Sequence, residues 1–247
     1  MKKILSSLFS LFLILPLMLC SCTPTPAEDE TTECTEAATT DPFENMEFYK
    51  PVIYLYPEED TEVSVKLDFK GALTVTIPDY RNGWNVLAKT DGTLTDLHDG
   101  KEYPYLFWEG RTKFMPDMTK GFVVKGDDTA SFLEDILEKM GLLPHEIADF
   151  IEYWLPFMQK NPYNLITFQG ENYKDVAPLT VTPAPDSILR VFMVYKPLEK
   201  PIEIAPPEII PFERNGFSVI EWGGARLKGQ TIQKTPSLPT ALTLLPK

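Results

Sequence analysis

Two short stretches of the sequence place a glutamate beside a tryptophan and close to a glycine. They read FWEG at residues 107–110 and IEWG at 220–223, and each falls at the end of an expected strand. Side chains at strand ends reach the rim of a sheet, and glycine there lets a ligand approach the backbone. If the two strand ends meet, the tryptophans would stack on sugar rings and the carboxylates would bind hydroxyl groups. The four candidate side chains are Trp108, Glu109, Glu221 and Trp222.

The same two carboxylates also suit a second chemistry, hydrolysis of a glycosidic bond. That reaction needs one acid and one base or nucleophile, roughly 5 to 9.5 Å apart, with one of them partly desolvated. A purely structural role is the alternative, with both tryptophans in the core and both glutamates paired at the surface, for instance with Arg111 or Arg226.

The sequence does not favour a metal site. Outside the N-terminal region it has two histidines and no cysteine, so a zinc site would need mostly carboxylates. His98 is expected in a turn and His145 at a helix start. Aspartates in the loops fit no calcium motif, so we expect them to be solvated; they are Asp96, Asp99, Asp127 and Asp128. No metal or other cofactor is therefore predicted.

Nucleophilic catalysis has little support either. The stretch GFSV at 216–219 begins like a nucleophile elbow, but Ile220 stands where the second glycine is needed. Ser218 is therefore expected to be an ordinary strand residue. Cys34 lies in a stretch without a folded scaffold, and no glycine-rich phosphate loop is present. The sequence therefore favours a protein without enzymatic activity over an enzyme.

Short strands fill the first half of the domain that must position these residues. Alternating apolar residues from 62 to 69 predict a strand with one wet face, and Lys70-Gly71 is expected to turn it into a hairpin with the strand 73–77. Further strands are predicted at 51–56, 84–88, 103–108 and 122–125, which suggests an antiparallel sheet or a small sandwich.

A helical pair and further strands follow. Ser131 and Glu134 form an expected capping box, and Gly141 is expected to end that helix. A second helix begins at Pro144, and we expect Pro156 to kink it. Strands are then predicted at 164–168, 179–182, 188–195 and 217–222. Strands, a helical pair and returning strands predict one α+β domain at residues 43–228.

The N-terminus has the form of an export signal. Lys2 and Lys3 precede an apolar run from 4 to 19, which is too short to span a membrane. The sequence Leu19-Cys20-Ser21-Cys22 resembles the lipobox of bacterial lipoproteins. The resemblance implies a signal peptide at 1–21 and acylation of Cys22, because small Ser21 suits the position before the acceptor. A signal peptide cut without lipidation is the alternative.

An acidic segment follows the predicted anchor. Residues 22–42 are rich in threonine, proline and carboxylates and have no basic residue, so we expect an extended tether. Loss of the two signal-peptide lysines changes the formal charge from −13 to −15, which excludes nucleic acid as a natural partner. A lone Cys34 in an exported chain suggests a Gram-positive or anaerobic surface, with pairing to another chain as the alternative. Residues 229–247 are polar and expected to be loosely held.

Five sequence blocks resemble an uncharacterised lipoprotein family of gut Gram-positive bacteria. They are KPVIYLYP at 50–57, YLFWEG at 105–110, YWLPFMQKNPYNLITF at 153–168, PDSILRVFMVYKPL at 185–198 and GFSVIEWGG at 216–224. The resemblance implies a shared fold and location but no activity. Together with the predicted anchor, it favours a lipid-anchored extracytoplasmic module that binds a glycan or another envelope component. A carboxylate-dependent glycoside hydrolase and a subunit of a membrane-associated complex are the alternatives.

Overall fold

The computed structural model describes residue 43 and residues 45–227, which all belong to one compact unit. It has two β-sheets and a small number of helices, so the predicted α+β fold is confirmed. The signal peptide with Cys22, the tether with Cys34 and the tail 229–247 lie outside the described residues. Within the described part, no helix is both long and apolar enough to cross a membrane.

The larger sheet has seven strands in the order β3-β7-β1-β12-β11-β9-β8. All neighbours in it are antiparallel except β11 and β12, which run parallel. Its strands are β1 (Met46–Tyr56), β3 (Ala72–Ile77), β7 (Leu106–Thr112), β8 (Phe122–Lys125), β9 (Tyr163–Gln169), β11 (Ser187–Leu198) and β12 (Ser218–Arg226).

The smaller sheet has five antiparallel strands in the order β10-β2-β4-β5-β6. They are β2 (Thr61–Leu67), β4 (Trp84–Ala88), β5 (Leu94–Asp96), β6 (Glu102–Tyr103) and β10 (Leu179–Thr182). The helices are a 3₁₀ turn (Gly126–Asp128), α1 (Thr129–Met140), α2 (Pro144–Met158) and α3 (Glu171–Val176).

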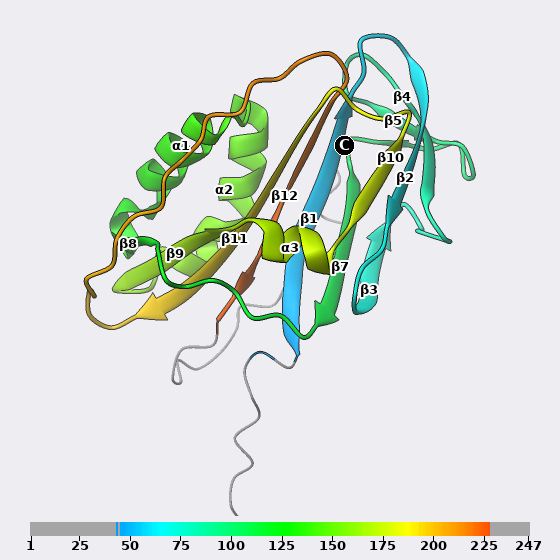
Figure 1. The fold of residues 1–247 in the computed structure, drawn as a ribbon. Coiled ribbons are helices and arrows are strands. Elements are labelled where there is room, and N and C mark those ends of the chain that lie inside the picture. The colour runs from blue at the N-terminus through cyan, green and yellow to red at the C-terminus, as the bar shows by residue number, and fades with distance from the viewer. Residues whose placement is uncertain (1–42, 44, 228–247) are drawn as a thin grey trace, which may run out of the picture. The chain divides into compact units, whose positions relative to one another are not determined.

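The large sheet is the middle of three layers (Figure 1). Helices α1 and α2 cover one face, and the small sheet covers the other. Successive side chains of each strand point to opposite faces and therefore pack into two separate apolar cores. In β1, Val52 faces the helices and Ile53 faces the small sheet. A strand buried on both sides reads as a continuous apolar run, and residues 191–195 of β11 are such a run, all buried.

Two local predictions are wrong. Strands β2 and β3 do not form a hairpin, because β2 pairs with β4 and β10 while β3 pairs with β7 in the other sheet. Gly71 lies where the chain crosses between the sheets, and a Cβ there would come within 2.3 Å of the Arg111 carbonyl oxygen. Ser131 does not cap α1, which begins at Thr129, and its hydroxyl instead donates to the Asp128 carbonyl oxygen.

The helix ends follow the sequence more closely. Gly141 ends α1 in the left-handed conformation, and its N–H bonds the Glu138 carbonyl oxygen. Helix α2 begins at Pro144 and continues through Pro156 to Met158. Glu146 accepts the N–H of Leu143 at 2.7 Å, which satisfies one donor at the start of α2.

A long connection without helix or strand joins β11 to β12. Residues 199–217 pass over the α1 and α2 side, so that β12 returns parallel to β11 (Figure 1). The Gly121 N–H donates to the carbonyl oxygen of Ala205 in this connection at 3.0 Å. The connection therefore also lies beside the edge strand β8.

A bulge interrupts β1 between its two neighbours. The two residues between Tyr49 and Val52 lie opposite a single residue of β12, Gly223, and the same extra residue appears against β7. Lys50 takes the left-handed conformation there, with φ 52°, and Pro51 needs no ladder partner for its nitrogen. Gly223 lies opposite, where an added Cβ would be 2.8 Å from the Cα of Pro51. The close approach of two backbones therefore requires glycine at 223.

Substitution Gly223→Ala is expected to lower the free energy of unfolding by about 1–3 kcal/mol, because overpacking against a backbone is relieved only by moving β1 or β12. Urea unfolding followed by tryptophan fluorescence measures the change. Thr180→Ala, at an exposed position of β10, is the control and is expected to change stability by less than about 0.5 kcal/mol. Equal stability of Gly223→Ala and the parent protein would contradict the close approach.

Candidate functional site

The two tryptophans of the predicted site are core residues on opposite faces of the large sheet. Trp108 and Trp222 are both 0% exposed. Trp108 packs in the core beneath the small sheet, and Trp222 packs in the core beneath the helices. Neither ring is available to stack on a sugar.

Glu221 lies inside the sheet-to-sheet core, where it pairs with Arg190. The Arg190 Nε to Glu221 Oε2 distance is 2.5 Å, and the two side chains are 5% and 1% exposed. Trp108 donates its indole N–H to Glu221 Oε1 at 3.3 Å. Burial alone lowers the pKa of Arg190, but the negative charge of Glu221 reverses this and raises it above its ordinary value.

Aromatic rings complete the surroundings of this ion pair. The Arg190 guanidinium lies 4.7 Å from the centroid of the Tyr173 ring, and Tyr173 stacks on Phe192 with centroids 4.2 Å apart. Both carboxylate oxygens of Glu221 are engaged and no solvent reaches them. Glu221 is a structural residue in this arrangement.

Glu109 faces the helix side of the sheet, because its strand neighbour Trp108 faces the other side. Its Oε1 accepts the backbone N–H of Lys50 at the β1 bulge, at 3.2 Å. Burial raises the pKa of Glu109. Since Glu109 and Glu221 lie on opposite faces of one sheet, with Glu221 paired to Arg190, they form no hydrolytic pair, and the expected cleft is absent.

The other residues considered from the sequence have local structural roles. Ser218 is buried and its hydroxyl shares a hydrogen bond with Ser187 at 2.9 Å. His98 is an exposed turn residue. His145 Nε2 lies 2.9 Å from the hydroxyl of Tyr56. Across residues 43 and 45–227, no three histidine, cysteine or acidic side chains are grouped as metal ligands.

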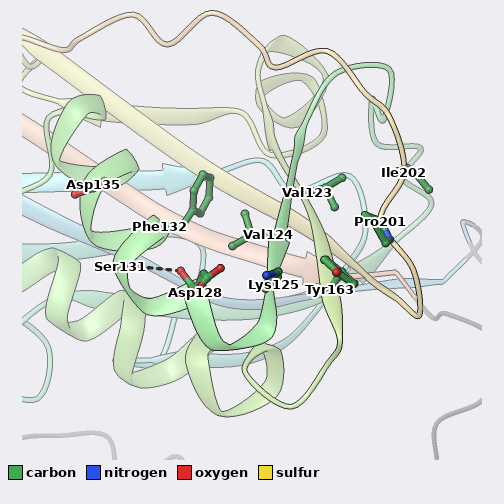
Figure 2. A pocket seen from close by; sticks show the side chains of 10 residues that line it. All are labelled: Val123, Val124, Lys125, Asp128, Ser131, Phe132, Asp135, Tyr163, Pro201 and Ile202. Carbon is green, nitrogen blue, oxygen red and sulfur yellow. Dashed lines mark hydrogen bonds between the residues drawn. The ribbon is translucent and has the colours of Figure 1, made fainter.

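A pocket lies between the edge strand β8, helix α1 and the start of the 199–217 connection (Figure 2). Its volume is 580 Å³, within the range of about 300–1,000 Å³ typical of small-ligand pockets. Val123, Phe132 and Ile202 give it apolar walls, while its polar groups are Lys125, Asp128, Ser131, Asp135 and Tyr163.

The pocket is formed by β8 and α1, which follow each other in the chain, together with β9 and the 199–217 connection, which come later in the sequence. Phe132 packs against Phe122 of β8 with ring centroids 5.1 Å apart, which holds α1 against the edge strand. Asp128, the last residue of the 3₁₀ turn, and Asp135 of α1 both line the pocket, and both are exposed. Tyr163 enters from β9, and Ile202, 47% exposed, closes the far side.

Sequence reasoning missed this pocket. The sequence pattern placed Asp128 in a solvated loop, and the connection that supplies Ile202 has no periodic pattern. A search for aromatic and acidic residues at helical spacing would have selected Phe132 and Asp135, but nothing local predicts that Ile202 lines the same pocket.

Fold and pocket together define a three-layer α+β domain with a largely open pocket at the sheet edge. A curated protein from Butyrivibrio fibrisolvens, named as an uncharacterized protein in the bglA 3′ region, is 55% identical to this chain over 64 residues. The match covers 25% of this chain, and the chain spans 65% of the length of that relative. This relative from a gut bacterium agrees with the expectation of an uncharacterised family.

Two broader comparisons give no match. No protein-family model matches the chain. No solved structure matches it either. The pocket is therefore the main basis for a functional argument.

Proposed function

We propose that the protein is an exported lipoprotein, anchored to the outer face of the cell membrane through acylated Cys22. The charged start, the short apolar run and the Leu19-Cys20-Ser21-Cys22 sequence support the proposal. The acidic stretch at 22–42 would hold the folded domain away from the bilayer, and its charge would oppose collapse onto anionic headgroups. The folded domain is then displayed at the cell surface.

The molecular role that we propose is binding of a glycan or another envelope component, without catalysis. The pocket between β8 and α1 carries this proposal. Saccharides are recognised by an aromatic face together with carboxylates and hydroxyls, and the pocket has Phe132 and Tyr163 beside Asp128 and Asp135. Lys125 adds a cation for an acidic sugar or a phosphate-bearing wall polymer.

The test uses residues 23–247, which lack the signal peptide and the acylated cysteine. We expect this protein to be retained by a cell-wall polysaccharide or by one class of sugar on a glycan array. Retention by no carbohydrate and no cell-wall fraction would overturn the proposal. Copurification with another membrane protein instead would favour the subunit alternative.

Substitution Asp135→Asn in the pocket is expected to weaken saccharide binding about tenfold, because a charge-assisted hydrogen bond contributes about 1.5–3 kcal/mol. Isothermal titration with the retained saccharide measures the dissociation constant. Glu138→Gln removes a charge from an exposed position of α1 outside the pocket, so it is the matched control. Equal weakening by both variants would show that only net charge matters.

A further inference from the structure

Lys50 is a buried lysine at the strained point of the β1 bulge. Its side chain is on the helix side of the large sheet, and the residue is 4% exposed. A left-handed φ of 52° is costly for a residue with a side chain, so surrounding contacts must hold it. The Lys50 N–H bond to Glu109 is one such contact, at 3.2 Å.

Aromatic rings surround the Lys50 amine. Its Nζ lies 5.4 Å from the ring centroid of Tyr105, 5.6 Å from that of Tyr153 and 6.0 Å from that of Trp222. It also lies 3.3 Å from the hydroxyl oxygen of Tyr105. These rings give the amine an apolar enclosure with one hydroxyl group within hydrogen-bonding distance.

Lys50 forms no ion pair within residues 43 and 45–227. The largest acidic influence on Lys50 comes from Asp149 of α2, whose carboxylate is engaged by the Tyr54 hydroxyl, which donates at 2.7 Å. Burial therefore lowers the pKa of Lys50, and the charges of Asp149, Glu152 and Glu109 offset this only in part. A larger share of the amine is then neutral at a given pH.

The enclosure lies close to the molecular surface. Glu152 on the same side of α2 is exposed, and Asp149 is half-buried. The charges of both residues reach the Lys50 amine, so Nζ lies on the side of its enclosure that is nearer to solvent.

We propose that Lys50 is a nucleophilic amine that captures the carbonyl group of a small aldehyde or ketone as a Schiff base. The free electron pair of neutral Nζ forms a bond to the carbonyl carbon, and the carbonyl oxygen takes up a proton to give a carbinolamine. Loss of water then gives the imine, so that no oxidant or reductant is needed. The Tyr105 hydroxyl is placed to pass the proton between nitrogen and oxygen. This chemistry is independent of glycan binding in the β8 pocket.

The test is competitive reductive labelling of folded residues 23–247 with benzaldehyde and cyanoborohydride at pH 7, followed by peptide mass spectrometry. Cyanoborohydride supplies the hydride that reduces the imine to a stable benzyl-lysine. Lys50 is expected to be labelled faster than the exposed Lys66 and Lys196, since its lowered pKa leaves a larger share of the amine neutral at this pH.

Two controls separate a reactive amine from a merely buried one. In guanidinium chloride the advantage of Lys50 is expected to disappear, because the enclosure is lost. Lys50→Arg keeps a cation but should lose the fast-labelled site while leaving the rates at Lys66 and Lys196 unchanged. If Lys50 is labelled more slowly in the folded protein than in the unfolded chain, burial protects it and the proposal is overturned.

Discussion

Substitution Arg190→Met is expected to lower the free energy of unfolding by about 3–5 kcal/mol, because it leaves the Glu221 carboxylate buried without its cation. The pair lies between two sheets, with both side chains at most 5% exposed, so water cannot replace the lost partner. Methionine keeps most of the side-chain length, which limits the cavity beside Tyr173. Urea unfolding curves of the parent and the variant measure the loss.

Two further variants test whether charge, rather than packing, accounts for this loss. Arg190→Met combined with Glu221→Gln is expected to recover much of the stability, since the second change removes the unpaired charge and keeps a side-chain acceptor for Trp108. Arg111→Met is the surface control. Its ion pair with Glu47 is 55% and 44% exposed, so its loss is expected to cost less than about 1 kcal/mol. If the double variant is no more stable than Arg190→Met, the buried charge does not cause the effect.

Periodicity predicted most elements of this fold but not their partners. Strands β4, β8 and β10 begin and end where the sequence pattern places them, because alternating and β-branched residues are a local signal. Pairing is not local. The two strands that flank Lys70-Gly71 enter different sheets, where β2 pairs with β4 and β3 pairs with β7.

The predicted site is wrong because two strands extend beyond their predicted ends. Strand β7 was expected to stop at Trp108 but continues to Thr112, and β12 was expected to stop at Trp222 but continues to Arg226. The candidate residues are therefore in strand interiors rather than at a rim. Glycines after Trp222 suggested an opening for a ligand, whereas Gly224 makes room for Trp154, whose ring would lie 2.8 Å from an added Cβ.

The burial of Lys50 could not be predicted from the sequence, because it depends on the β1 bulge. This lysine precedes Pro51 at the head of an apolar run, a position that indicates a solvent-exposed strand start. The extra residue of the bulge turns the side chain toward α2 instead. A lysine-proline step inside a strand buried on both faces is the one local sign of such a bulge.

Substitution Cys22→Ser is expected to move the protein from the membrane fraction into the medium, because the predicted acylation site is lost. Two or three acyl chains hold a protein far more firmly than one, so the ratio of membrane-bound to released protein should fall on the order of tenfold or more. Fractionation of a Gram-positive host that expresses the full chain, with radioactive palmitate to label acyl groups, measures both anchoring and modification.

The matched control is Cys20→Ser, because the two cysteines are separated only by Ser21. If Cys22 is the acceptor, Cys20→Ser keeps both the acyl label and membrane retention, since Leu19 and Ser21 remain at the third and first positions before the acceptor. Loss of label in Cys20→Ser but not in Cys22→Ser would show that Cys20 is the acylated residue and would contradict the prediction. Release of the unsubstituted chain without label would identify a signal peptide cut without lipidation, and the domain would then act free of the membrane.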